Sequence, residues 1–185
     1  MKHRCFWVTD SKLYQDYHDN EWGVAVYDDA VLFEFLVLET FQAGVNWSTV
    51  LNKRENFRKA FNAFDCRKIA MYPESKFTEL MQDSGIIRNK LKIKSSISNA
   101  HLFMQIQKEF GSFSEYIWAF VNGKPIVNEF HTSAEVPATT AVSDKLSKDL
   151  KRRGFKFTGS TIMYAYMQAV GMVNDHTTNC FKYLN

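Results

Sequence analysis

The chain has 185 residues, of which 45% are hydrophobic and 23% charged, a composition typical of a globular protein long enough to bury its own core. The net charge of +3 is too small to establish a nucleic-acid partner by itself, and no apolar run approaches the roughly 20 residues that a membrane helix requires. The charged N-terminal stretch lacks the apolar core of a signal peptide, so we expect a cytoplasmic protein with no membrane partner.

Helical patterns follow one another through the first two thirds of the chain. Residues 29–42 are apolar nearly all round, which predicts a buried helix, and residues 48–64 place their apolar side chains on one stripe of a second helix. Further helices are expected around 75–82, over 89–110 and over 113–121. Few prolines interrupt these segments, which favours helices.

The last third begins with a stretch rich in loop-forming residues. Residues 122–141 contain two of the three prolines and are interpreted as a long surface loop. A helix over 143–154 is expected to start with Ser143 as its N-cap and to end at Gly154, and residues 160–173 predict a final buried helix. The predicted fold class is all-α. No internal repeat or linker divides the chain, so we expect one compact unit, with two helical lobes as the alternative.

Residues that ligate metals stand at both ends of the chain. His176 and Cys180 are four positions apart, and Cys5 and His18 have a spacing suitable for a second pair of ligands. Two thiolates and two imidazoles would complete the tetrahedron of a structural zinc site, and an odd number of cysteines argues against a disulfide framework. The alternative is that His18 lies on a helix surface and the cysteines are small core residues. His3 is a rival ligand.

Several longer motifs occur in a specific order. They are YHDNEWG at 17–23, LETFQAGVNWSTVL at 38–51, KRENFRKAF, GIIRNKLKI, LSKDLKRRGFKFTGSTI and MQAVGMVNDH. From Cys5 to Cys180 the sequence therefore resembles the bacterial 3-methyladenine DNA glycosylase I family of the helix-hairpin-helix superfamily. The resemblance implies a helix-hairpin-helix DNA glycosylase fold, with one structural zinc joining the N- and C-termini and no role for His3. The implied zinc ligands are Cys5, His18, His176 and Cys180.

The resemblance also implies a function in base-excision repair. Such an enzyme flips N3-methyladenine out of alkylated double-stranded DNA, hydrolyses its N-glycosidic bond, and releases free 3-methyladenine from an intact abasic site. Because an adenine alkylated at N3 is cationic, its departure needs little protonation, and the pocket must recognise a cation rather than supply a strong acid. Three cysteines cannot supply the four ligands of an iron–sulfur cluster, and no lysine nucleophile can be assigned, so a monofunctional enzyme is expected. A monomer is also expected. The competing class is a zinc-stapled DNA-binding module without enzymatic activity.

Glu39 is the candidate catalytic and base-binding residue. It is the only acid between Phe35 and Trp47, and a buried carboxylate is costly without a partner. A local tyrosine or backbone amide would be a structural partner, whereas the matching family glutamate contacts the flipped base. Aromatic faces stacked on a cationic purine would add cation–π attraction of roughly 0.5 to 2 kcal/mol. The aromatic residues at the family's pocket positions, for which core packing is the alternative, are Trp7, Tyr17, Trp22 and Trp47.

Two segments are expected to contact DNA. In the family, residues at the positions of Gly44 and Val45 enter the gap left by the flipped nucleotide, although Val45 is shorter than the common leucine and Gly44 could simply end a helix. A helix-hairpin-helix is expected around 76–100, with phosphates bound by the hairpin amides and by nearby cations. Its predicted DNA-binding residues are Gly85, Ile86, Arg88, Asn89, Lys90 and Lys92. The basic cluster over 148–156 is interpreted as a solvated helix face, with a second DNA-binding surface as the alternative.

Overall fold

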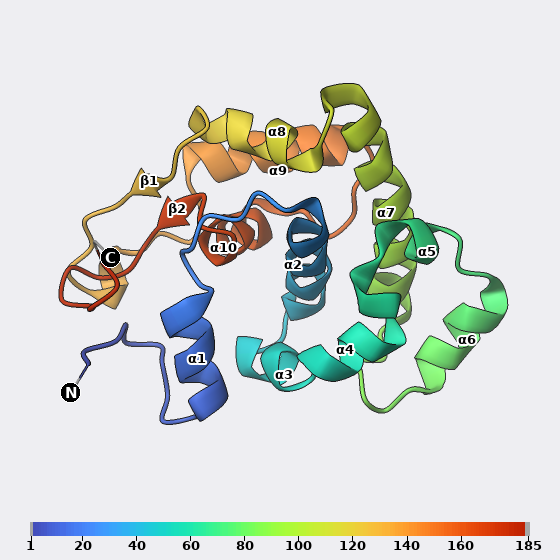
Figure 1. The fold of residues 1–185 in the computed structure, drawn as a ribbon, viewed down its shortest axis with the longest axis horizontal. Coiled ribbons are helices and arrows are strands. Elements are labelled where there is room, and N and C mark those ends of the chain that lie inside the picture. The colour runs from blue at the N-terminus through green and yellow to red at the C-terminus, as the bar shows by residue number, and fades with distance from the viewer. Residues whose placement is uncertain (1, 184–185) are drawn as a thin grey trace.

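A computed structural model describes residues 2–183 of the chain and is built mainly of helices (Figure 1). The all-α prediction is confirmed, with a two-residue parallel strand pair as the only sheet in the described part of the chain. The α-helices are α1 Lys12–Asn20, α2 Asp29–Gln42, α3 Trp47–Asn52, α4 Arg54–Ala60, α5 Cys66–Ala70, α6 Glu74–Gln82, α7 Lys90–Phe110, α8 Phe113–Trp118, α9 Ala141–Arg152 and α10 Ser160–Ala169. Short 3₁₀ helices cover Asn62–Phe64, Ala119–Val121 and Ser133–Glu135, and the strands are β1 Ile126–Val127 and β2 Val173–Asn174.

Helix α2 stands near the middle of the molecule and contacts α7, α8 and α10 (Figure 1). Asp28 caps its start by accepting hydrogen bonds from the amides of Ala30 and Val31 at 2.8 and 3.0 Å. The neighbouring carboxylate of Asp29 accepts hydrogen bonds from the amides of Phe113 and Ser114, which begin α8. The helix is therefore fixed at its N-terminus, and its apolar sequence supplies much of the core.

The segment 48–64 differs from the single helix expected there. Its apolar stripe is buried as predicted, but the helix is broken at Lys53, which separates α3 from α4. The Nζ atom of Lys53 donates to the carbonyls of Ser84 and Gly85 at 3.0 and 3.2 Å, so tertiary contacts hold the break. Periodicity fixes which side chains face the core, but it does not distinguish a continuous helix from two helices that present the same stripe.

The stretch 122–141 is more ordered than a surface loop. Within it β1 pairs with β2, with Ile126 opposite Val173, and this pair holds the stretch against the C-terminal segment. The expected cap of α9 is also corrected, because Thr140 is the N-cap and Ser143 lies at the third helical position. Each of these two side chains accepts a hydrogen bond from the other's amide, which forms a capping box.

The two ends of the described chain lie on the same side of the molecule (Figure 1). The amide of Phe181 donates to the carbonyl of His3 at 2.9 Å, which joins the segments directly. None of the helices between residues 2 and 183 combines the length and the apolar character that crossing a membrane would require.

Candidate active site and metal centre

A cavity of about 330 Å³ lies among α1, α2, α3, α10 and the segment around 136–138, a size within the usual range of ligand pockets. All five residues predicted to bind the base line this cavity, although they come from four separate parts of the chain. They are Trp7, Tyr17, Trp22, Glu39 and Trp47.

The aromatic side chains of the cavity contact one another edge to face or at a tilt. The ring centre of Trp7 lies 5.0 Å from that of Trp22 and 6.2 Å from that of Tyr17, and Tyr17 lies 5.2 Å from Trp47. Tyr17 and Trp22 are buried, whereas Trp7 and Trp47 are partly exposed. Rings that hold one another in place form a rigid wall against which a planar purine can stack.

Glu39 projects from the C-terminal half of α2 and is 2% exposed. Burial away from water raises its carboxyl pKa to about 8, because desolvation disfavours the charged form. Its Oε2 atom accepts no hydrogen bond from the described residues, and the buried Nε1–H of Trp47 likewise has no partner there. Among the described residues, only Thr158 contributes a third buried polar side-chain atom of this kind, so two of the three unsatisfied atoms belong to one cavity.

An unsatisfied acceptor and an unsatisfied donor in the same cavity have a chemical meaning. Buried polar groups are almost always hydrogen-bonded in folded proteins, so each exception calls for a partner such as a ligand, an ion or an ordered water. A ligand that donates to Glu39 and accepts from Trp47 would satisfy both groups. A purine, with an exocyclic amino group and ring nitrogens, offers both kinds of atom.

Sequence reasoning missed part of the cavity wall. The segment from Val136 to Ala138, within the stretch interpreted as a surface loop, contributes an apolar side, and Asp175 contributes a second carboxylate. Asp175 is 2% exposed and accepts hydrogen bonds from the hydroxyl of Tyr164 at 2.6 Å and from the side-chain amides of Asn128 and Gln168. Only its place beside the metal ligand His176 in the sequence could have drawn attention to it.

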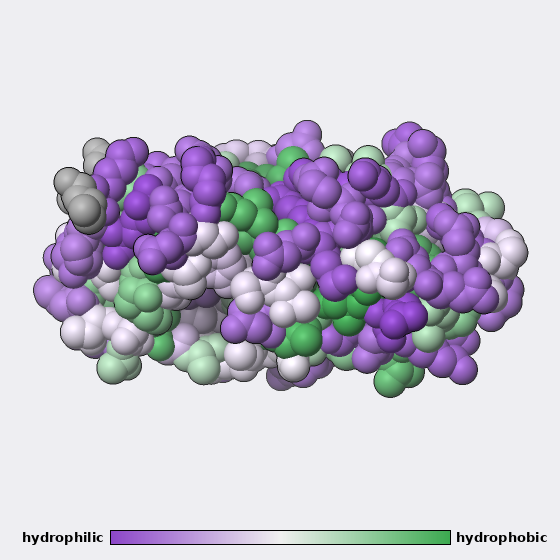
Figure 2. All heavy atoms as spheres, turned by 90° about the horizontal axis from the view of Figure 1, so that it is seen from below, coloured by the Kyte–Doolittle hydropathy of each residue, from purple (hydrophilic) through white to green (hydrophobic). Residues whose placement is uncertain are grey.

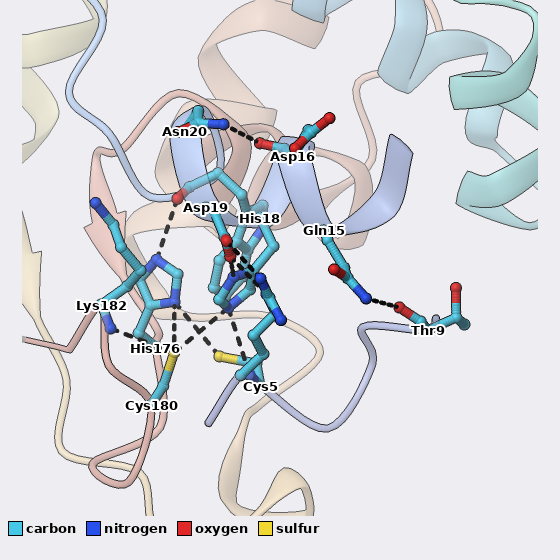
Figure 3. A network of polar contacts seen from close by, with 12 residues as sticks. Cys5, Thr9, Gln15, Asp16, His18, Asp19, Asn20, His176, Cys180 and Lys182 are labelled. Atoms are coloured by element: carbon cyan, nitrogen blue, oxygen red, sulfur yellow. Dashed lines mark hydrogen bonds and ion pairs between the residues drawn. The ribbon is translucent and has the colours of Figure 1, made fainter. Parts of the chain in front are cut away.

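Four ligand atoms converge where the two ends of the chain meet (Figure 3). They are the Sγ atoms of Cys5 and Cys180, Nε2 of His18 and Nδ1 of His176, all within 4.8 Å of one another and all on buried residues. The Cys5–His176 and Cys180–His18 contacts are both 3.4 Å, and the Cys180–His176 contact is 3.5 Å. Bond lengths of about 2.0–2.3 Å in a tetrahedral site place neighbouring ligand atoms about 3.3–3.8 Å apart. The three contacts at 3.4–3.5 Å match this spacing, so the four residues could hold a metal ion.

The second nitrogen of each imidazole has its own partner, which orients the ring. Nδ1–H of His18 donates to Asp19 at 2.8 Å, and Nε2–H of His176 donates to the carbonyl of Trp22 at 3.1 Å. Arg4 forms a bidentate pair with Asp19, with both contacts at 2.8 Å, and this pairing lowers the carboxyl pKa of Asp19 to about 2. Both rings thus present the correct nitrogen to the ligand cluster.

The candidate metal centre and the cavity share the same short segments. Cys5 is followed by Phe6 and Trp7, Tyr17 precedes His18, and Asp175 precedes His176, and each of these neighbours lines the cavity. The structure explains why the motif YHDNEWG ends in a glycine, Gly23. Its φ is +77°, and a Cβ atom there would lie 3.0 Å from the ring of His176.

The predicted wedge and hairpin lie along the lower edge of the molecule in Figure 1, and Figure 2 shows this face as mainly hydrophilic with smaller hydrophobic groups. Gly44 has a φ of +75°, and Val45 is 37% exposed. These two residues lie in the connection 43–46 between α2 and α3, so the wedge segment links the helix of Glu39 to that of Trp47.

The α6–α7 hairpin has fewer available amides than the sequence indicates. The amides of Gly85 and Ile86 donate to Asp83, that of Asn89 donates to Ile87, and the side chain of Ile86 is buried. The amides of Ile87 and Arg88 make no hydrogen bond within the described part of the chain. Arg88 and Lys90 are exposed. Gly85 lies in a tight space, because a Cβ atom there would lie 2.9 Å from Oδ1 of Asp83 and would force that side chain to shift.

The remaining predicted or candidate DNA-binding cations differ in whether they already form hydrogen bonds or ion pairs within the protein. Lys92, expected to meet phosphates, is 6% exposed and donates to backbone carbonyls instead, which corrects that prediction. In the cluster over 148–156, Arg153 pairs with Glu109 and Asp149, whereas Lys148, Lys151 and Lys156 are exposed.

Together, the helical fold, the aromatic cavity with its buried carboxylate and a Cys/His cluster that could hold a metal ion are the features of a purine-binding protein. The family model of methyladenine glycosylase matches residues 7–183, and the chain belongs to this family. It is 49% identical to DNA-3-methyladenine glycosylase 1 of Escherichia coli (strain K12) over 180 residues, which cover 97% of this chain and 96% of the relative. It is 47% identical to DNA-3-methyladenine glycosylase of Haemophilus influenzae, with 97% of each chain covered.

Solved structures give the same result. A crystal structure of 3-methyladenine DNA glycosylase I superposes with a TM-score of 0.95 at 47% identity, covering 98% of this chain and all of the other. The Staphylococcus aureus enzyme, solved to show the structural basis of 3-methyladenine recognition, has a TM-score of 0.95 at 32% identity, covering 98% of this chain and 97% of the other. The fold is therefore that of this enzyme family.

Proposed function

We propose that this protein is a monofunctional DNA glycosylase of base-excision repair. It hydrolyses the N-glycosidic bond of N3-methyladenine in alkylated double-stranded DNA, releases the free base and leaves an abasic site. Family membership and the relatives of nearly half-identical sequence support the enzyme class. The observation that carries the substrate assignment is the pair of unsatisfied atoms, Oε2 of Glu39 and Nε1 of Trp47, inside an aromatic cavity.

The chemistry follows from the charge of the lesion. When the bond between C1′ and N9 breaks, its electron pair moves to the purine and neutralises the positive charge, while the oxygen of a water molecule bonds to C1′ and its proton leaves to solvent. The base is already a good leaving group, so the protein needs to hold the flipped nucleotide and to stabilise charge. Glu39 accepts a hydrogen bond from the exocyclic amino group, and the faces of Trp7, Tyr17, Trp22 and Trp47 surround the cationic ring.

Glu39 changes its charge in the course of this cycle. With a pKa of about 8 in the free protein, the carboxyl is mainly protonated at neutral pH. A cation placed against it favours the ionised form, because opposite charges at close range lower a carboxyl pKa. An ordinary adenine is uncharged and gives Glu39 no reason to ionise. It binds either next to a neutral carboxyl or next to a buried carboxylate whose desolvation makes binding less favourable. This difference selects the cationic base.

Zinc is the metal we propose for the Cys₂His₂ cluster. Two thiolates and two imidazoles are its preferred ligands, and with all four positions filled by the protein the ion is structural and leaves no place for a metal-bound water. The ion would tie the segment of Cys5 to the segment of Cys180 and so hold the two ends of the chain together. All of its ligands come from one chain, in keeping with the monomer that we propose.

DNA contacts are proposed for two surfaces. The hairpin of the helix-hairpin-helix, with its turn at Gly85, offers the free amides of Ile87 and Arg88 and the cations Arg88 and Lys90 to phosphates. The Gly44–Val45 segment is the wedge that fills the gap left by the flipped nucleotide. The amides of Ile86 and Asn89, which are also predicted DNA-binding residues, are bonded within the hairpin, so they are not counted among the amides offered to phosphates.

The direct test is the release of free bases from alkylated DNA, measured by chromatography. We expect rapid release of 3-methyladenine by the zinc-loaded protein and a strong loss of release in the Glu39→Gln variant. A protein that binds the DNA but releases no base would show that the chain is a binding module, and would overturn the proposal.

A further inference from the structure

Lys92 is a buried cation with an unusual pair of partners. It lies in the first turn of α7 and is 6% exposed, and its Nζ atom donates to the carbonyl of Phe41 at 2.8 Å and to that of Ala43 at 2.5 Å. Burial lowers the pKa of its ammonium group, since desolvation disfavours the charge. No carboxylate within residues 2–183 pairs with it, so the charge is compensated by these peptide carbonyls.

The carbonyls that Lys92 binds belong to the C-terminal end of α2. A helix leaves its last carbonyls without intrahelical partners, and its dipole favours a cation there. The chain then turns through Gly44 and Val45, and the amide of Val45 returns to the carbonyl of Gln42 at 2.7 Å. Lys92 therefore binds the backbone immediately before Val45, whose side chain is exposed.

Lys92 also contacts the α6–α7 hairpin. The amide of Lys92 donates to the side chain of Asn89, which caps α7 at the end of the hairpin. A second lysine, Lys53 at the α3–α4 junction, donates to the hairpin carbonyls of Ser84 and Gly85. One lysine thus links α7 to the segment after α2, and the second links the α3–α4 junction to the hairpin, so the two surfaces are joined by charge-assisted hydrogen bonds to backbone.

We propose that Lys92 is a positioning residue that fixes the Gly44–Val45 segment relative to the α6–α7 hairpin, so that the segment enters the duplex at the point where the hairpin holds the phosphates. The inference rests on the proposed function, because it assigns Lys92 a task only if these two segments contact DNA. Lys92 itself is too buried to touch DNA. Its effect is therefore exerted on a duplex substrate and not on the isolated base.

The experiment compares Lys92→Met with Lys108→Met, which alters an exposed lysine in the last turn of the same helix. Single-turnover release of 3-methyladenine is measured from alkylated duplex DNA and from the same DNA after heat denaturation. Binding of free 3-methyladenine is followed by tryptophan fluorescence. We expect Lys92→Met to slow release from the duplex by about tenfold to a hundredfold, the range for losing charge-assisted hydrogen bonds. Release from denatured DNA and binding of the free base should stay at wild-type level, and Lys108→Met should change nothing.

A double-mutant cycle with Val45→Ala tests the route of the effect. If Lys92 acts through the wedge, the two substitutions together should slow duplex release by less than the product of their separate effects. If Lys92→Met does not fold, Lys92→Gln, which keeps a neutral donor, is measured in the same way. Unchanged duplex release, or an equal loss of free-base binding and duplex release, would overturn the role of Lys92 while the proposed function stands. A wild-type protein that releases no 3-methyladenine would instead overturn the proposed function.

Discussion

Replacement of Glu39 by glutamine should make the protein more stable and less active. The carboxyl pKa is about 8 in the folded protein and near 4.5 in the unfolded chain. Between these values the folded state holds a proton that the unfolded state has released, so the free energy of unfolding of the wild type falls as pH rises from 4.5 to 8. At about 1.4 kcal/mol per pH unit, the deficit is about 3 kcal/mol at pH 7 and about 5 kcal/mol above pH 8. Glu39→Gln removes it.

The same substitution removes the charge that recognises the lesion. A glutamine at this position would keep the shape of the side chain and one acceptor, so the loss in excision should be that of one charge-assisted hydrogen bond, about 1.5–3 kcal/mol or roughly tenfold to a hundredfold in rate. The assays are urea unfolding at pH 5, 7 and 8.5 and single-turnover release of 3-methyladenine. Glu115→Gln, an exposed glutamate of α8, is the matched control and should leave both unchanged.

Two results would refute this reasoning. If the difference in unfolding free energy between Glu39→Gln and the wild type does not grow between pH 5 and 8.5, the buried carboxyl is not the desolvated group described above. If the variant excises 3-methyladenine at the wild-type rate, the aromatic walls alone recognise the base and Glu39 has a structural role.

Three further outcomes are expected. Removal of the metal with a chelator should lower the melting temperature and weaken free-base binding, because Trp7 and Tyr17 lie in segments that carry the proposed metal ligands. Tryptophan fluorescence measures both quantities. Normal base binding by the metal-depleted protein would show that the metal does not support the cavity. Arg88→Ala should weaken DNA binding and reduce the salt slope of log K by about one, with free-base binding intact, as measured by fluorescence anisotropy in a salt series; an unchanged slope would remove Arg88 from the DNA surface. Neutral ethenoadenine should be released poorly in the chromatographic assay, and strong release would contradict recognition by charge.

The helices that carry the site could be predicted from local patterns. The apolar run of α2 is buried because its residues leave no polar face, whereas residues 48–64 turn one apolar stripe to the core and leave most of their polar residues outside. Periodicity could not show the break at Lys53, since that break is held by carbonyls of the hairpin far along the chain. The cap of α9 was misplaced by three residues because Thr140 and Ser143 are both good capping residues and only backbone geometry separates them.

The sequence by itself named the five candidate base-binding residues and the four candidate metal ligands, but not the whole cavity wall. The Cys and His residues and Glu39 attract attention by their chemistry, whereas the aromatic residues and the assigned roles come from the resemblance carried by motifs in a fixed order. The tertiary structure alone decided which groups meet. It brings Asp175 and the segment at Val136 to the cavity, leaves Oε2 of Glu39 without a partner among the described residues, and buries Lys92 against the end of α2. These facts depend on contacts between distant segments, and burial and hydrogen-bond satisfaction are properties of those contacts rather than of any local pattern.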